Sequence, residues 1–275
     1  MKNNMVVTTS LFDLNRQNWN NYNRPIEEYK KYAQNMLSLD CDMVIYTTSD
    51  LKSFFEDNRK LYKEKTIIIT MDLKDIPYYD YLDRITNLMT SDFFVNKIRN
   101  APGIDRYRPE ANYPIYNIIQ FAKSKFLKMT IDNDYFKSKY HCWMDVGIYH
   151  DKFPQKYKFE KFPSSNLKIL SDEKIHHFYI DHPRESDLNK LEYYSMLGDV
   201  RMTGGWFGGT KNAMLLYSDL IENVVNQSIH EGVISDDQNM YTIAYLQNKN
   251  KFHLHDGNFA VNPWFAGLDY FMEKQ

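Results

Sequence analysis

The stretch that decides the fold runs from Met5 to Phe12, MVVTTSLF, and it is apolar and rich in β-branched residues. This composition predicts a buried first strand. Two similar runs follow, MVIYTT at Met43 to Thr48 and TIIIT at Thr66 to Thr70, and segments with helical spacing separate the three. Strands that alternate with helices predict βαβ units and a mostly parallel sheet. Because the runs do not alternate polar with apolar residues, we expect helices to cover both faces of the sheet.

The second half continues the same pattern with shorter elements. A long amphipathic helix is predicted over Tyr113 to Met129, and a strand over His141 to Ile148 follows it. Short strands over Leu167 to Leu170 and His176 to Ile180 predict a small secondary sheet. The expected fold class is therefore α/β, with a mostly parallel central sheet flanked by helices and a smaller sheet beside it.

The chain shows no internal repeat, linker or low-complexity segment, so we expect a single domain over its 275 residues. Residues 1–148 are interpreted as a nucleotide-binding half, and residues 149–275 as an acceptor- or sugar-binding half. The nucleotide-binding half carries neither a Gly-x-Gly-x-x-Gly fingerprint nor a phosphate loop ending in Lys-Ser or Lys-Thr. This argues against a dinucleotide dehydrogenase and against a P-loop kinase.

Composition excludes further classes of protein. A hydrophobic fraction of 43% argues against disorder, and a net charge of −2 gives no field that favours nucleic acid. Cys41 and Cys142 imply no disulfide framework and fit a reducing compartment. No apolar run is long enough for a signal peptide or a transmembrane segment, so the sequence predicts a soluble, cytoplasmic protein. Peripheral contact with a membrane that carries a lipid-linked acceptor stays open.

Asp145 is the sharpest single signal for chemistry. It stands at the predicted end of the His141 to Ile148 strand, and ligands of open α/β sheets bind beyond the carboxyl ends of the strands. A carboxylate there can hold Mg²⁺ or Mn²⁺ on a nucleotide diphosphate, and Gly147 leaves room for the ligand. The alternative is that Asp145 only caps a turn.

The segment from Gly204 to Gly209, GGWFGG, holds four of the ten glycines. We expect it to be a loop in which glycines adopt positive φ angles or approach a ligand closely. The candidate contacts of the donor sugar in this loop are Gly204, Gly205, Trp206, Phe207 and Gly208. The aromatic rings would then stack on a sugar. A purely structural turn is the alternative.

Asp236 and Asp237 begin a predicted helix, with Gln238 after them. Acids at this position are expected as helix caps. The functional interpretation is that Asp237, or Asp236, projects into a sugar site as the catalytic acid and stabilises positive charge at the anomeric carbon.

Two histidines, His253 and His255, lie in a predicted last strand. We expect them to face opposite ways, so that only one can share a site with Asp145. His255 is favoured because Asp256 and a glycine follow it. Two further pairs, His141 with Cys142 and His176 with His177, have no zinc-like spacing to a second ligand pair, so no structural zinc is predicted.

Four blocks of sequence together resemble the HtrL/YibB family. They are Thr8 to Asp13 (TTSLFD) with Arg16, Trp143 to Ile148 (WMDVGI), Gly204 to Gly209 (GGWFGG) and Ser235 to Gln238 (SDDQ). The family is regarded as glycosyltransferase-like, so the resemblance implies a GT-A-like, nucleotide-sugar-binding fold. A looser likeness to the retaining galactosyltransferase and glycogenin group implies a UDP-sugar donor and an Mn²⁺ or Mg²⁺ cofactor.

By that looser likeness, Asp145 takes the place of a DxD carboxylate and His255 that of a late metal-binding histidine. Gly147 stands where the second acid of a DxD motif belongs, which departs from the pattern. Arg16 and Lys123 are candidate contacts of the donor diphosphate. Thr9, in the first block, is a further candidate donor contact.

The favoured function is a metal-assisted glycosyltransferase that moves a sugar from a nucleotide donor to a glycan or lipid-linked acceptor. The departure at Gly147 keeps a second reading open, a catalytically inactive nucleotide-sugar-binding protein of the same fold. A third reading is a nucleotidyl- or phosphotransferase on the same architecture. The sequence does not choose the sugar, the acceptor or the stereochemical outcome.

Overall fold

The computed structural model describes residues 2–100, 105–148, 162–163, 166–188, 200–260 and 262–271. Its strands form one seven-stranded sheet in the order β3-β2-β1-β4-β6-β5-β7. They are β1 (Lys2–Leu11), β2 (Asp42–Thr47), β3 (Thr66–Thr70), β4 (Ser138–Met144), β5 (Ile175–Tyr179), β6 (Met202–Thr210) and β7 (Phe252–Asp256).

The helices begin where the sequence signals them. Ile26 follows Pro25, Thr210 caps the helix that follows β6, and Asp236 caps the next one. They are α1 (Ile26–Leu37), α2 (Lys52–Asn58), α3 (Leu82–Thr90), α4 (Pro109–Asn112), α5 (Pro114–Asn133), α6 (Glu185–Leu188), α8 (Lys211–Glu231), α9 (Asp237–Gln247) and α10 (Ala266–Phe271).

The sheet is mostly parallel, as the sequence predicts. β1 pairs in parallel with both β2 and β4, and β2 pairs in parallel with β3. The exception is β6, which runs antiparallel between β4 and β5, and β7 then pairs in parallel with β5. The expectation of a mixed α/β fold with a mostly parallel central sheet is confirmed.

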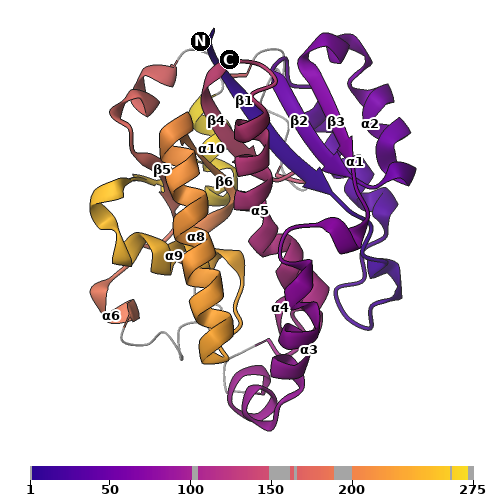
Figure 1. Ribbon diagram of the computed structural model, residues 1–275, viewed down its shortest axis with the longest axis vertical. Helices are drawn as coiled ribbons and strands as arrows, with labels where there is room; N and C mark the ends of the chain where they lie inside the picture. The colour runs from indigo at the N-terminus through magenta and orange to yellow at the C-terminus, as the bar shows by residue number, and fades with distance from the viewer. Residues whose placement is uncertain are drawn as a thin grey trace.

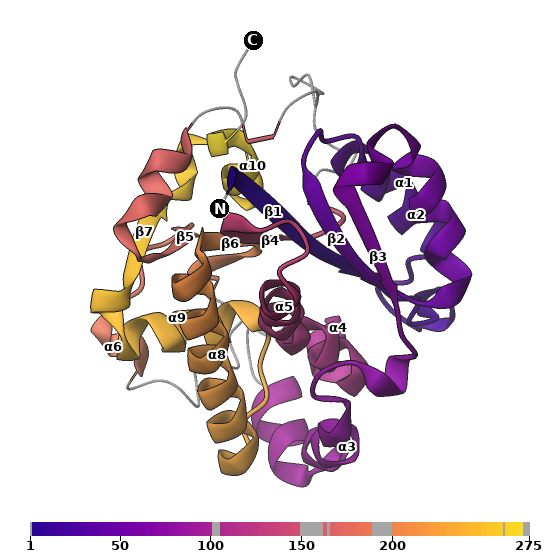
Figure 2. The ribbon, with the colours of Figure 1, turned by 45° about the horizontal axis from the view of Figure 1, so that its top comes forward.

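Helices cover both faces of this sheet (Figures 1 and 2). Residues of α3, α5, α8 and α9 form one core cluster against one face, and residues of α1, α2 and α10 form the other. Successive side chains in a strand point to opposite faces, so Trp143 and Phe207 enter the first core, whereas Met144 and Trp206 enter the second.

Two predictions about the second half are wrong. Leu167 to Leu170 lie in a 3₁₀ helix (Asn166–Asp172), and the strand predicted near His176 joins the central sheet as β5. In the described part of the chain there is therefore no separate secondary sheet. The reason is the segment Gly204 to Gly209, which is not a loop but the middle of β6 and bridges β4 to β5.

Two further observations bear on the setting of the protein. Cys41 and Cys142 are buried and both are free thiols. Among the helices of the described residues, none has the length and apolar character that crossing a membrane requires.

Candidate active site

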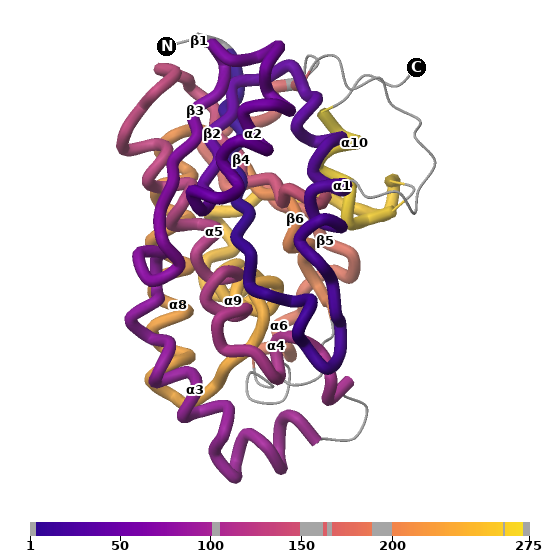
Figure 3. The backbone as a smooth tube through the Cα atoms, turned by 90° about the vertical axis from the view of Figure 1, so that its right-hand side faces the viewer, coloured from indigo at the N-terminus to yellow at the C-terminus, as the bar shows by residue number. Residues whose placement is uncertain are grey.

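A cavity of about 350 Å³ opens at the carboxyl edge of β1 and β4. The segment after β1 descends beside α4 before the chain returns through α1 (Figure 3), and it walls one side of the cavity. The other walls come from α5, from the residues after β4 and from the start of β6. The residues after β4 meet the start of β6 because these two strands are antiparallel. At this meeting point the Asp145 amide donates to the Gly205 carbonyl at 2.9 Å.

Lys123, on α5, lies at the centre of the charged groups around this cavity. Its Nζ is 2.7 Å from Asp237 Oδ2 and 2.9 Å from Asp145 Oδ1, and it donates to the Gly204 carbonyl at 3.1 Å. The lysine is buried, Asp237 is buried, and Asp145 keeps 36% of its side chain exposed. The ammonium therefore ties the middle of α5 to the end of β4, the start of β6 and the start of α9.

The ionisation of these groups follows from their burial and their pairing. Burial favours a neutral Lys123, but Asp145 and Asp237 outweigh it and raise the pKa of the lysine above its usual value. Burial raises the pKa of Asp237 to about 6, against the opposing effect of Lys123. Asp237 Oδ1 is buried and has no hydrogen-bond partner among the described residues.

Arg16 brings a second positive charge to the cavity. Its guanidinium lies 4.7 Å from the Trp19 ring centroid and 5.2 Å from that of Tyr116. It donates to the Tyr29 hydroxyl and, at 3.1 Å, to the Tyr22 carbonyl. Aromatic faces hold a guanidinium without neutralising its charge. Among the described residues no carboxylate forms a salt bridge with Arg16, so its charge remains available to an anion.

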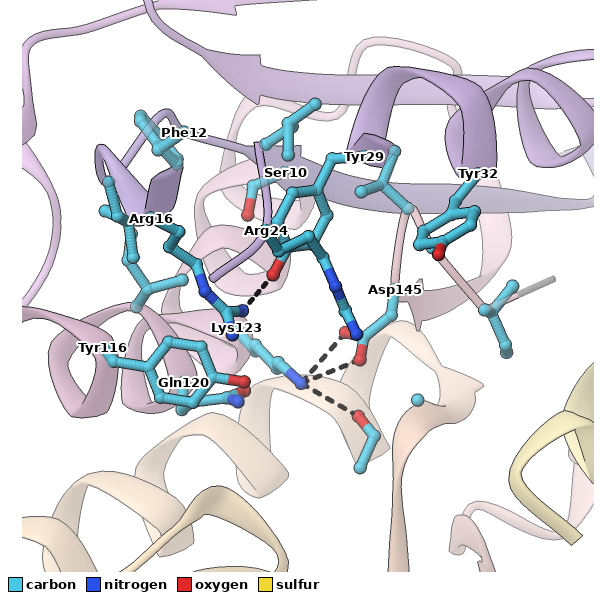
Figure 4. A pocket seen from close by; sticks show the side chains of 18 of the residues that line it. Ser10, Phe12, Arg16, Arg24, Tyr29, Tyr32, Tyr116, Gln120, Lys123 and Asp145 are labelled. Atoms are coloured by element: carbon cyan, nitrogen blue, oxygen red, sulfur yellow. Dashed lines mark hydrogen bonds and ion pairs between the residues drawn. The ribbon is translucent and has the colours of Figure 1, made fainter. Parts of the chain in front are cut away.

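Arg24 brings a third positive charge, just before α1. Its guanidinium carbon lies 5.3 Å from the Tyr29 ring centroid and 5.7 Å from that of Tyr32, and its Nε is 3.5 Å from Glu28 Oε1. Figure 4 shows the side chains of Arg16, Arg24 and Lys123 extending into the same cavity as Asp145. Anions in such a cavity meet convergent hydrogen-bond donors as well as positive charge.

The structure brings half of the predicted site residues to this cavity. Those that line it are Arg16, Lys123, Asp145, Gly147, Gly204, Gly205 and Gln238. Those that do not line it are Thr9, Trp206, Phe207, Gly208, Asp236, Asp237 and His255. Thr9 is fully buried within β1, so the expectation that it contacts a donor is wrong.

Trp206 and Phe207 are also fully buried, which contradicts the expectation that their rings stack on a sugar. Each ring fills one of the two cores. The glycines around them adopt no positive φ angle, and a Cβ at Gly208 would lie 2.9 Å from the Cβ of Cys142. Gly208 is therefore required by strand packing rather than by a ligand.

Asp236 and Asp237 do not project into the cavity as predicted. Asp236 Oδ1 accepts from the Asn239 amide at 3.0 Å, which makes it the N-cap of α9, and its Oδ2 is 3.5 Å from Arg108 Nη2. Asp237 is turned toward Lys123 and also accepts from the Tyr241 hydroxyl at 3.3 Å. Asp237 therefore influences the cavity only by holding the Lys123 ammonium in place.

His255 does not share a site with Asp145. It lies on the face of the sheet that Trp206 and Phe178 occupy, whereas Asp145 is tied to Trp143 and Lys123 on the other face. Two strands, β6 and β5, also separate β4 from β7. The expectation that His255 and Asp145 hold one metal ion is therefore wrong.

The two histidines of β7 face the same way, not opposite ways, because side chains two residues apart share a face of a strand. His253 and His255 stack with ring centroids 4.6 Å apart, and His176 of β5 lies beside them. Asp172, His176 and His253 form a triad whose donor atoms lie within 4.8 Å of one another, close enough to hold one metal ion.

A divalent ion at Asp145 does not fit the contacts of that residue. Its oxygens lie 2.9 and 3.0 Å from Lys123 Nζ, and Oδ1 also accepts from Trp143 Nε1 at 2.7 Å. Gly147 supplies no second carboxylate. An ammonium in contact with both oxygens repels a dication from the place where it would bind.

The sequence did not point to several residues that line the cavity. They include Arg24, Tyr29, Tyr32, Tyr116 and Trp264. Tyr29 and Tyr32 have the three-residue spacing of one helix face, which was a usable signal. Nothing local places Arg24 or Tyr116 there, because the segment between β1 and α1 must first fold against α4 and α5.

The fold is a mostly parallel α/β sheet, and its cavity lies at the carboxyl edge, where ligands of open α/β sheets bind. The chain belongs to the HtrL/YibB family. The family model described as "Bacterial protein of unknown function (HtrL_YibB)" matches residues 3–271.

Two known proteins are similar to this chain. Protein HtrL of Escherichia coli (strain K12) is 23% identical over an alignment that covers 96% of this chain and 91% of that protein. The crystal structure of mouse xyloside xylosyltransferase 1, in its apo form, is similar with a TM-score of 0.45 and 13% identity. That alignment covers 93% of this chain and 86% of the xylosyltransferase chain.

Proposed function

We propose that the chain is a glycosyltransferase that moves a sugar from a UDP-sugar donor to a glycan or lipid-linked acceptor. The observation that carries the proposal is the convergence of three cationic side chains with Asp145 and Gln238 on one cavity. The cavity of about 350 Å³ lies within the usual range for small-molecule sites.

The cations suit the diphosphate of such a donor. Arg16 and Arg24 offer planar, multiple N–H donors that match phosphate oxygens, and Lys123 adds a compact positive charge. Tyr29, Tyr32 and other rings nearby offer faces for the base or the sugar. Asp13, Glu110 and Asp145 also line the cavity, so the cations would act through direct contacts with the diphosphate rather than through an excess of positive charge.

The sugar end of the donor is assigned to the opposite wall. Gly204, Gly205 and Gln238 line it, and the Gln238 amide can both donate to and accept from sugar hydroxyls. A Cβ at Gly204 would lie 3.0 Å from Asp237 Oδ2, so a larger residue there would press on the Lys123–Asp237 pair. Asp237 acts in the proposal as a positioning residue for Lys123.

In the transfer step, the bond between the anomeric carbon and the diphosphate oxygen breaks and its electron pair stays on that oxygen. The acceptor hydroxyl oxygen forms the new bond to the anomeric carbon, and its proton passes to an oxygen of the leaving diphosphate. Lys123 and the two arginines stabilise the charge that develops on the leaving diphosphate. This arrangement takes the place of the expected Mn²⁺ or Mg²⁺ at Asp145. The two free buried thiols, Cys41 and Cys142, support a cytoplasmic setting.

The test is a thermal-stability screen of nucleotide sugars, followed by a transfer and donor-hydrolysis assay with each donor that binds. A donor at 100 times its dissociation constant should add about 2.7 kcal/mol of stability, which is visible as a shift of the melting temperature. If no nucleotide sugar shifts the melting temperature, the proposal fails.

Arg24→Met should weaken donor binding by roughly tenfold to a hundredfold, because a hydrogen bond to a charged group contributes about 1.5–3 kcal/mol. Arg84→Met is the matched control, since Arg84 lies exposed on α3 and does not line the cavity. Isothermal titration with the donor found in the screen measures both variants. Equal affinities for the two variants would remove Arg24 from the site.

A second candidate is a nucleotide-sugar-binding protein without catalytic activity. The observation that favours it is the absence of a second acid at Gly147, together with the occupation of Asp145 by Lys123. Titration with and without Mn²⁺, paired with a donor-hydrolysis assay, separates the two candidates. Binding of a donor with no turnover in the presence of any acceptor would favour this second function.

A further inference from the structure

A cluster of metal-ligating side chains lies away from the cavity, at the β7 edge of the sheet. We define the histidine cluster as Asp172, His176, His253 and His255. His176 on β5 is the direct partner of His253 on β7, and Asp172 ends the 3₁₀ helix that precedes β5. Figure 2 shows β7 at the opposite edge of the sheet from β3.

The donor atoms of the cluster converge on one carboxylate. His176 Nε2 lies 2.8 Å from Asp172 Oδ1, and His253 Nδ1 lies 3.0 Å from Asp172 Oδ2. The carboxylate itself is held in place, because Oδ1 also accepts from the Lys174 amide at 3.0 Å. Two imidazole nitrogens and a carboxylate oxygen therefore face one another from three separate segments.

His255, the fourth member of the histidine cluster, orients the buried side chain of His176. His255 Nε2 lies 2.8 Å from His176 Nδ1, so an N–H on His176 Nδ1 can donate to it. That bond fixes the tautomer of His176 that leaves Nε2 free to bind a metal ion. The rings are also stacked, with the His176 centroid 5.0 Å from that of His253 and 5.1 Å from that of His255.

We propose that Asp172, His176 and His253 bind one divalent transition-metal ion of the zinc type, with His255 as a positioning residue. Imidazole nitrogens with one carboxylate are a donor set for Zn²⁺ and its neighbours rather than for Mg²⁺ or Ca²⁺. Three protein ligands leave a further coordination position for water.

The geometry needs only small side-chain movements. A tetrahedral ion with bonds of about 2.0–2.2 Å separates its donor atoms by roughly 3.3 Å. The donors already lie within 4.8 Å of one another, and the two hydrogen-bonded pairs must widen slightly. His176 is buried, whereas the side chains of Asp172 and His253 are 38% and 46% exposed and give the ion a route from solvent.

The position of the site defines what the ion would do. It joins the edge strand β7 to β5 and to the end of the preceding 3₁₀ helix, so it would fasten the edge of the sheet. Because it lies on the other face from Asp145 and two strands away from β4, it would not contact a ligand in the cavity. The proposal is independent of the transferase activity.

The experiment is metal binding by the untagged full-length protein after treatment with a chelator. Titration with Zn²⁺ should give one ion per chain and raise the melting temperature, and Co²⁺ as a spectroscopic probe should give the visible absorption of a site with bound nitrogen. A wild-type protein that binds no Zn²⁺ would overturn the proposal.

The ligand assignment is tested with His253→Asn and Asp172→Asn. Each should weaken Zn²⁺ binding at least tenfold, and His255→Gln should weaken it about tenfold to a hundredfold because it orients a ligand. The matched control is His230→Asn, since His230 is an exposed histidine on α8 outside the cluster. His253 is half-exposed, so its variant should unfold in chelator at the same temperature as the control. Unchanged Zn²⁺ affinity in His253→Asn would refute the assignment.

Discussion

At the scale of single residues, Lys123 decides the chemistry of the cavity. A lysine with 5% exposure is tolerated because two carboxylates and a carbonyl satisfy its ammonium. The arrangement also explains why Asp237 can be buried, since its charge has a partner at 2.7 Å. Removing one partner of a buried pair leaves the other charge uncompensated, which costs more than the pair contributes.

Replacing Lys123 should therefore destabilise the fold as well as the site. We expect Lys123→Met to lower the free energy of unfolding by about 3–5 kcal/mol, because Asp237 is left buried without its partner. Lys125→Met is the control on the same helix. Lys125 pairs with the partly exposed Glu222, so its loss should change the free energy by about 1 kcal/mol or less. Urea unfolding measures both, and similar values for the two variants would contradict the assigned role.

Asp237 makes stability depend on pH in a defined direction. Its pKa in the folded protein is about 6, above the ordinary 3.8, so the folded state binds its proton more tightly than the unfolded state. The stabilisation by that proton is complete below about pH 4 and is lost as the pH rises through about 6.

Wild-type protein should accordingly lose stability relative to Asp237→Asn across this range, by at most about 1.4 kcal/mol per pH unit. Urea unfolding of both proteins at a series of pH values measures the difference. If the difference in unfolding free energy between wild type and Asp237→Asn stays constant, or if wild type gains stability as the pH rises, Lys123 holds the Asp237 carboxylate ionised at all these pH values.

At the scale of elements, β6 and α10 pack closely against each other through Trp206 and a glycine. Trp206 packs its ring on α10, where a Cβ at Gly267 would lie 2.3 Å from Trp206 Cγ. The short helix can approach the sheet only because Gly267 has no side chain. Gly208 of β6 and Gly267 of α10 therefore mark close packing between the strand and its neighbours, whereas Gly204 and Gly205 line the cavity.

Gly267→Ala tests this packing. Alanine normally favours a helix over glycine by up to about 1 kcal/mol, but the overlap with a buried ring should reverse the sign and cost about 1–3 kcal/mol. Gly147→Ala is the matched control, because the nearest atom to its Cβ would be 3.8 Å away. Denaturant midpoints compare the two. A Gly267→Ala protein as stable as the wild type would mean that α10 moves away from Trp206 at little cost.

At the scale of the whole molecule, cationic side chains from three segments meet at one cavity. Arg16 follows β1, Arg24 precedes α1 and Lys123 lies on α5, and the fold brings all three to one cavity. Because Lys123 occupies both oxygens of Asp145, we expect the proposed glycosyl transfer to proceed without Mn²⁺ or Mg²⁺. Turnover after treatment with a chelator should stay within about twofold of turnover with added Mn²⁺, since no step needs a metal at Asp145. A loss of about tenfold or more, restored by Mn²⁺, would contradict this expectation.

Much of the fold was predictable from the sequence. The runs at Met43 to Thr48 and Thr66 to Thr70 are strands, and the long helix predicted from Tyr113 starts at Pro114. The candidate site was predictable only in part. Asp145, Gly147 and Gln238 line the cavity, but Trp206 and His255 lie elsewhere, because burial and choice of face depend on which strand pairs with which.

The sequence by itself determined the elements, since strand and helix patterns depend on neighbours within a few residues along the chain. Only the tertiary structure decided which side chains meet. Lys123 and Asp237 are 114 residues apart, and no local pattern links them. The antiparallel insertion of β6 decides both outcomes: it brings Gly204 to the cavity, and it carries β5 and β7, with their histidines, to the far edge of the sheet. Such pairings rest on long-range hydrogen bonds and core packing, whose energy exists only in the assembled fold.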